Sequence, residues 1–160
     1  MKVADLKGSF YYAMHGCGAF RGILHSNSKD AYQYWRNKVR IFETDVVETD
    51  DEQFVLFASH GLTNQDLQRL EIFSPVPSGL RTKEWLLNQK VYSRSSCGLT
   101  VMSLEYVLDE MMEDENLLFI FDLYGLWEST FSFAQYLAKL NRGRNLLDRI
   151  IVEVYSLLSR

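Results

Sequence analysis

The sequence predicts one α/β domain, residues 1–160, with a mostly parallel sheet. Short apolar, β-branched or aromatic segments alternate with segments whose apolar residues recur at helical spacing, which favours this fold class. Two strand candidates, Phe54–Ala58 and Leu117–Phe121, are continuously apolar, as is typical of strands buried on both faces of a parallel sheet. The composition, 47% hydrophobic and 24% charged, is that of an ordinary globular domain.

The first half of the chain is predicted to hold three strands and one helix. The first strand runs into a glycine-rich loop that begins at His15. The helix follows this loop, with Asn27 as its expected N-cap and a helical stripe of Ala31, Tyr34, Trp35 and Val39. The three strands are expected at 9–14, 39–47 and 54–59.

The second half repeats the alternation after a stretch, residues 61–98, that has no clear period. Ser103 is expected to cap a helix whose buried stripe is Leu104, Val107, Leu108, Met111 and Met112. A second helix, starting near Trp127, separates two further strands at 117–122 and 149–155. The pattern therefore contains about five strands with flanking helices.

Charge and hydropathy exclude several classes of partner. The net charge is −4 and no basic run occurs, so we expect no nucleic-acid partner. No apolar run approaches the roughly 20 residues that span a bilayer, and the N-terminus lacks the apolar core of a signal peptide. Cys17 and Cys97 form no disulfide framework or metal-binding spacing. We therefore expect a cytoplasmic location.

Two carboxylates on one strand are the most informative local feature. Glu43 and Asp45 are two residues apart, so they share a face with Ile41. Carboxylates on such a face are costly unless something compensates their charge, and a hard divalent cation is the natural compensator. The alternative is a solvent-facing edge strand, where the same pair is harmless.

Polar side chains also follow four of the predicted strands. His15 and His60 each come directly after a predicted strand, and Asp45 lies near the end of another. Asp122 directly follows the apolar run Leu117–Phe121. Ligands bind at the carboxyl ends of strands in parallel α/β sheets, so these four groups are expected to converge. Cys17 is interpreted as a small bystander and His25 as a solvated residue.

Several segments together resemble the glycerophosphodiester phosphodiesterase-like and phospholipase-C-like superfamily. The segments are MHGCG (14–18), SNSKDAY (26–32), FETDVVETDDEQFVLFASHG (42–61), LTVMSLEYVLDEM (99–111), LLFIFDLYG (117–125) and LLDRIIVEVYS (146–156). The resemblance implies an incomplete TIM-type (β/α) barrel of about five parallel strands. It also implies phosphodiester cleavage with a divalent cation, Ca²⁺ or Mg²⁺.

The resemblance assigns roles to individual residues. It implies that His15 and His60 are the acid–base pair and that Glu43, Asp45 and Asp122 bind the metal. Other residues expected to bind substrate, either a small phosphodiester or a lipid headgroup, are Gly16, Arg21 and Tyr124. Tyr124 stands where the family often has lysine, so this position supplies no positive charge to the phosphate.

Length leads to an alternative function. A complete barrel of this type takes about 250 residues, whereas this chain has 160. A partial barrel has open sheet edges, and open edges attract other strands. The alternative is therefore a catalytically impaired homologue that acts as an oligomeric binding or interaction module, with a homo-oligomer closing the sheet.

Overall fold

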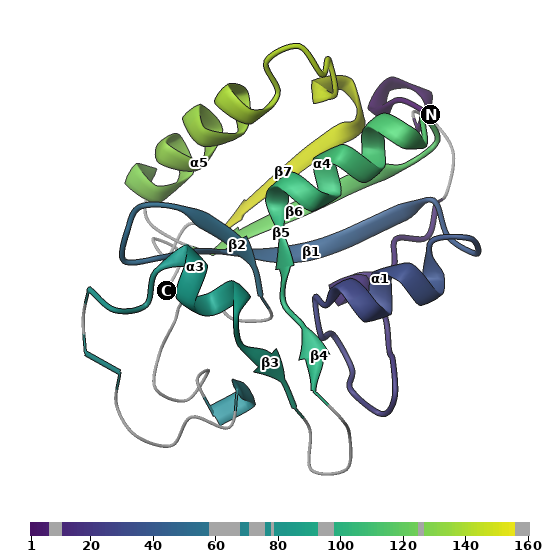
Figure 1. Cartoon of the computed structure of the whole chain (residues 1–160). Coiled ribbons are helices and arrows are strands. Elements are labelled where there is room, and N and C mark those ends of the chain that lie inside the picture. Colours follow the sequence, from purple (N-terminus) through teal and green to yellow (C-terminus); the bar gives the residue numbers. More distant parts are fainter. Residues whose placement is uncertain are drawn as a thin grey trace.

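The computed structural model describes residues 1–6, 11–57, 68–70, 76–77, 79–92, 98–124 and 127–155. Its principal sheet has five strands in the order β5-β2-β1-β6-β7, and β3 and β4 form a separate pair. Helices α4 and α5 lie on the same side of β1, β6 and β7 (Figure 1). The strands are β1 Ile41–Glu48, β2 Phe54–Leu56, β3 Lys90–Val91, β4 Leu99–Thr100, β5 Met102–Ser103, β6 Leu118–Tyr124 and β7 Ile150–Tyr155. The helices are α1 Lys29–Trp35, α3 Lys83–Leu87, α4 Leu104–Glu113 and α5 Trp127–Leu140, with 3-10 helices η1 Val3–Leu6, η2 His15–Cys17, η3 Gln68–Leu70 and η4 Leu147–Arg149.

The sheet is mixed, so the expectation of about five parallel strands is wrong for β2. Strands β1, β6 and β7 are parallel, whereas β2 is antiparallel to both β1 and β5. The reason is the connection between β1 and β2, which is only residues 49–53. A parallel crossover needs about a dozen residues or more, so this short acidic turn makes a hairpin.

The burial of β2 agrees with the sequence pattern although its direction does not. Phe54 and Leu56 pack in the main core, which also contains α4 and α5, and Val55 packs in a second core on the opposite face. All three side chains are 0–1% exposed. A continuous apolar run therefore indicated burial on both faces, and it did not determine the strand's direction.

The first predicted strand, 9–14, is reduced to a single bridge among its described residues. Residues 9 and 10 lie outside the described part, and Met14 pairs in parallel with Phe42. Two backbone hydrogen bonds make this bridge: Met14 N donates to Ile41 O at 2.9 Å, and Glu43 N donates to Met14 O at 3.0 Å. The bridge places the start of the glycine loop beside β1.

The helix caps correct one expectation and confirm another. Ser28, not Asn27, caps α1, and its Oγ accepts a hydrogen bond from Ala31 N at 3.1 Å. Ser103 caps α4 as predicted, accepting from Tyr106 N at 3.1 Å. The predicted stripe of α4 is buried except for Met112, which is 52% exposed.

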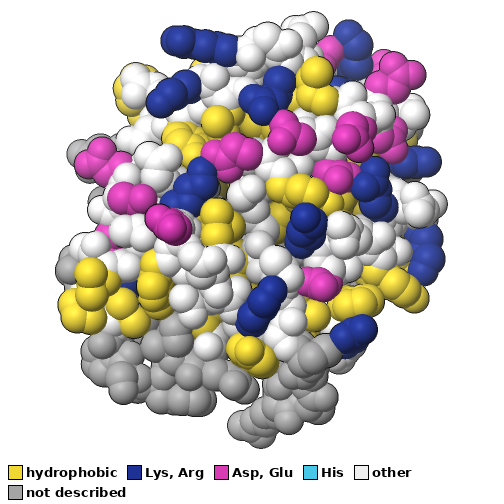
Figure 2. All heavy atoms as spheres, viewed as in Figure 1, with side chains coloured by type: hydrophobic (Ala, Val, Ile, Leu, Met, Phe, Trp, Pro, Cys, Tyr) yellow, Lys and Arg dark blue, Asp and Glu magenta, His cyan; other side chains and the backbone are white. Residues whose placement is uncertain are grey.

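The surface agrees with the balanced charge of the sequence. On the face shown in Figure 2, acidic and basic side chains are interspersed rather than segregated. Among the described residues, none of the helices combines the length and the apolar character that crossing a bilayer requires.

Candidate metal and phosphodiester site

Three carboxylates meet on one face of the sheet. Glu43 and Asp45 project from β1, and Asp122 projects from β6 directly opposite Asp45 in the parallel register. One oxygen from each of the three lies within 4.8 Å of the others. The structure therefore brings together the three residues that the family resemblance implies as metal ligands, although their role stays a prediction.

Alternation along β1 explains why acidic residues can occupy a central strand. Phe42 and Val46 point into the main core with the helices, while Glu43 and Asp45 occupy the other face. Glu43 is nevertheless only 9% exposed. Burial, together with the negative charges of Asp45 and Asp122, raises the pKa of Glu43 to about 7.

The glycine loop supplies the groups that oppose this shift. Gly16 N donates to Glu43 Oε2 at 2.7 Å, and His15 Nε2 lies 3.6 Å from the same oxygen. Gly16 has φ +56°, and a Cβ at this position would lie 2.5 Å from the Cα atom of His25. Glycine is therefore required both by the backbone conformation and by the close approach of the chain.

Two residues of this loop belong to the site although the sequence gave them other roles. The ring of His25 lies 4.1 Å, centroid to centroid, from that of His15, so His25 is exposed, as expected, but also touches the candidate acid–base residue. Asn27 is fully buried, and its Nδ2 donates to Asp45 Oδ2 at 2.6 Å. Both residues have positive φ, +50° and +48°, and no local periodicity indicates such conformations.

The remaining predicted residues differ in how the structure places them. Arg21 is exposed in the same loop, with its guanidinium carbon 5.3 Å from the Phe20 ring centroid. Tyr124 is the last residue of β6, and its side chain lies outside the described part. His60 also lies outside the described residues. Cys17 is fully buried, and burial raises the pKa of its thiol far above the usual range, which suits an inert small residue.

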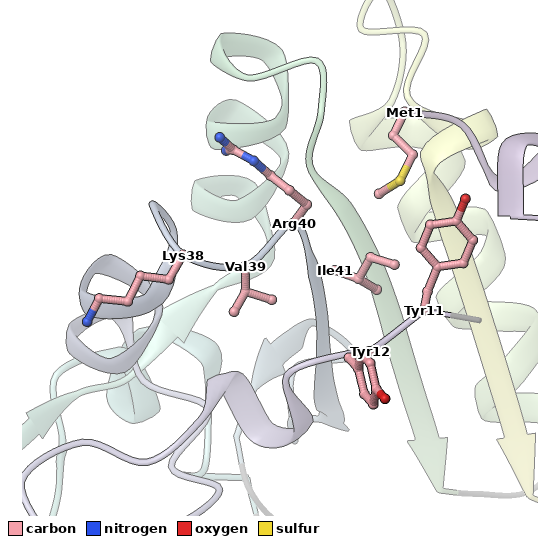
Figure 3. Close-up of a pocket in the computed structure, with 7 residues that line it drawn as sticks. All are labelled: Met1, Tyr11, Tyr12, Lys38, Val39, Arg40 and Ile41. Atoms are coloured by element: carbon pink, nitrogen blue, oxygen red, sulfur yellow. The ribbon is translucent and has the colours of Figure 1, made fainter. Parts of the chain in front are cut away.

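A pocket of about 380 Å³ lies elsewhere, beside the beginning of β1 (Figure 3). Its charged side chains already have partners: Lys38 Nζ lies 3.7 Å from the centroid of the Tyr34 ring, and Arg40 pairs with Asp114 at 2.7 Å. None of the three carboxylates lines it. Its wall also contains Met1, Tyr11, Tyr12, Val39 and Ile41.

The fold is that of glycerophosphodiester phosphodiesterase domains. A protein of Galdieria sulphuraria classed with these enzymes matches 90% of this chain at a TM-score of 0.64 and 18% identity, and the match covers 56% of that protein. One from Silicibacter pomeroyi gives 90% coverage, a TM-score of 0.68 and 15% identity, with 57% of that chain covered. The glycerophosphoryl diester phosphodiesterase domain of a Mycobacterium tuberculosis protein matches 90% of this chain at a TM-score of 0.65 and 13% identity. The match covers 52% of that protein.

This chain thus spans about half the length of the solved structures that it matches. It is an α/β protein with an open mixed sheet that corresponds to about half of their TIM-type barrels. No protein-family model matches the sequence, and no curated protein matches it. The resemblance predicted from the sequence motifs is therefore confirmed at the level of the fold.

Proposed function

We propose that this chain cleaves phosphodiesters with the help of a divalent cation held by Glu43, Asp45 and Asp122. The observation that carries the proposal is the approach of three carboxylate oxygens to within 4.8 Å of one another. Ca²⁺ binds oxygen at about 2.3–2.6 Å, so two of its ligands are at most about 5 Å apart. Separations within this limit are compatible with Ca²⁺, and Mg²⁺ requires oxygen separations of about 4.2 Å or less.

The loop residues would handle protons and bind the phosphate. A bound cation supplies charge neutralisation and polarises a phosphoryl oxygen. His15 is exposed beside Glu43, and imidazole exchanges protons near neutral pH, so His15 serves as one member of the acid–base pair. His60 enters the proposal as the other member from the sequence alone.

The proposed substrate is a small phosphodiester or a lipid headgroup. Gly16 lets the substrate approach the backbone beside Glu43, and Arg21 contributes a positive charge from the exposed part of the loop. Tyr124 provides a hydroxyl where the family often has an ammonium group. We therefore expect weaker phosphate binding than a lysine at this position would give.

The test is an assay of the purified chain against glycerophosphocholine and bis(4-nitrophenyl) phosphate, with Ca²⁺, Mg²⁺ or EDTA. We expect cleavage with a cation, its loss in EDTA, and its loss in Asp45→Asn. Glu113→Gln is the matched control, because Glu113 is an exposed carboxylate at the end of α4. Absence of cleavage with either cation, or cleavage that survives in Asp45→Asn, would overturn the proposal.

Among the described residues, β7 is an edge strand of the principal sheet, and this edge favours a second candidate, an oligomeric interaction module. Val152 and Val154 on this edge strand are 38% and 42% exposed. The register partner of Val152, Phe121, is fully buried on the same face of the sheet. Edge strands with exposed apolar side chains pair readily with other strands. Light scattering distinguishes this candidate, because it requires a mass well above 18.7 kDa.

A further inference from the structure

We propose that Asn27 is a positioning residue of the metal site, because its carboxamide holds Asp45 in the orientation in which it binds a cation. This inference rests on the proposed function. Asn27 does not belong to the three candidate ligands, and its expected role as a helix cap is filled by Ser28. It is fully buried beside Asp45, and its side chain contacts this residue.

The two ends of the Asn27 carboxamide contact one residue. Its Nδ2 donates to Asp45 Oδ2 at 2.6 Å, and its Oδ1 accepts from Asp45 N at 3.3 Å. The carboxylate and the backbone amide of Asp45 thus both bind the carboxamide of Asn27, and this restricts rotation of the carboxylate. A hydrogen bond from an amide to a carboxylate is among the stronger kinds in proteins, and it uses only part of the capacity of the carboxylate to accept or ligate.

Asn27 is itself held in place. It has φ +48°, a conformation that asparagine adopts more readily than most residues other than glycine. Its backbone N donates to Gly16 O at 3.0 Å. The two neighbours of Asn27, Ser26 and Ser28, are also buried, and their hydroxyl oxygens are 2.8 Å apart. A rigid group of this kind can orient its partner rather than follow it.

The same loop holds the second carboxylate of β1. Gly16 accepts from Asn27 through its carbonyl and donates through its amide to Glu43 Oε2 at 2.7 Å. A continuous path of hydrogen bonds therefore runs from Glu43 through Gly16 and Asn27 to Asp45. Like charges at this distance repel, and donors fixed on one loop keep both carboxylates on the same side. Hydrogen-bond partners of this kind, behind the ligands, often change metal affinity 10–100-fold when they are removed.

The experiment compares Asn27→Gly with Asn145→Gly in the full chain. Asn145 is an exposed asparagine with φ +56°, in the turn after α5, so both substitutions place glycine at a left-handed position. Isothermal titration with Ca²⁺ alone gives the dissociation constant, and thermal unfolding without metal gives the stability. We expect the dissociation constant to rise 10–100-fold in Asn27→Gly and to stay unchanged in Asn145→Gly.

The outcomes separate positioning from a merely structural role. If Asn27→Gly unfolds at a lower temperature yet binds Ca²⁺ as tightly as the wild type, this inference is overturned and the proposed function stands. If the wild type binds no cation, the proposed function fails and this inference falls with it. If circular dichroism shows the glycine variant to be unfolded, the titrations of all three proteins are repeated in sucrose, which stabilises folded states.

Discussion

The two faces of β1 and β6 are built from alternate residues of the same strands, and they differ in chemical character. On the helix side, Phe42, Phe119 and Phe121 stack with ring centroids 5.5 and 5.9 Å apart and are fully buried. On the other side, Asp45 and Asp122 stand opposite each other, with Glu43 beside them. The first face stabilises the domain, and the second brings like charges together.

The difference shows that burial alone does not define the core of this sheet. Glu43 is nearly as inaccessible as its aromatic neighbours, but burial raises its pKa to about 7 instead of contributing stability. Fixed clusters of like charge are expected where a ligand offsets them, and perturbed carboxyl groups concentrate at functional sites. Changes on the two faces should therefore separate function from stability.

The largest effect is expected on the acidic face. Asp122→Asn removes a proposed ligand while preserving the shape of the side chain, so cation-dependent phosphodiester cleavage should fall about a thousandfold or more. Stability without metal should not fall, because the substitution relieves like-charge repulsion. The measurements are kcat/KM with Ca²⁺ and a urea unfolding curve. An unchanged kcat/KM would remove Asp122 from the site.

On the aromatic face we expect the reverse. Phe121→Ala leaves a cavity among Phe119, Phe133 and the helices, so the free energy of unfolding should fall by about 3–5 kcal/mol. Phe131→Ala is the control, because Phe131 on α5 is 67% exposed and its loss should cost roughly 0.5 kcal/mol or less. Equal losses in urea unfolding for the two variants would contradict this assignment of the core.

Glu43 allows the acidic face to be tested by the pH dependence of stability. Its pKa is 4.5 when unfolded and about 7 in the fold, so the native state binds the extra proton. Because of this group, the free energy of unfolding without metal should therefore fall by about 3 kcal/mol as the pH rises from about 4.5 to 7. It should stay low above pH 7.

Glu43→Gln should remove this dependence. The variant should be up to about 3 kcal/mol more stable than the wild type at pH 8 and equal to it at pH 4, while losing Ca²⁺ affinity. Chemical unfolding at both pH values measures the difference, with Glu113→Gln as the exposed control. A variant that is less stable than the wild type at pH 8 would show that Glu43 is not a strained carboxyl group.

The smallest effect on stability is expected at the β7 edge. Replacing both Val152 and Val154 by lysine should change the free energy of unfolding by less than about 1 kcal/mol, because both side chains are substantially exposed. If this edge joins copies of the chain, the charges should dissociate them. Light scattering of the double variant and of Leu147→Lys, an exposed apolar control on η4, gives the answer. A double variant that keeps the mass of a wild-type oligomer would exclude the edge.

Several elements follow from the sequence because they depend on neighbouring residues. The cap at Ser103, the buried stripe of α4 and the shared face of Glu43 and Asp45 follow from helical and strand periods. The five residues that precede β2 also indicate its antiparallel direction, since they are too few for a parallel crossover. The continuous apolar run of β2 is typical of parallel strands and points to the opposite direction.

The composition of the site follows from the sequence alone: two carboxylates on one strand, a third on another strand, and a histidine before a glycine. How these groups are held depends on the tertiary structure. Asp122 meets Asp45 because of the parallel register of β6 on β1. Asn27 and His25 reach the site through left-handed backbone conformations in a loop. Such contacts depend on how the chain folds back on itself, and no periodicity along the sequence encodes them.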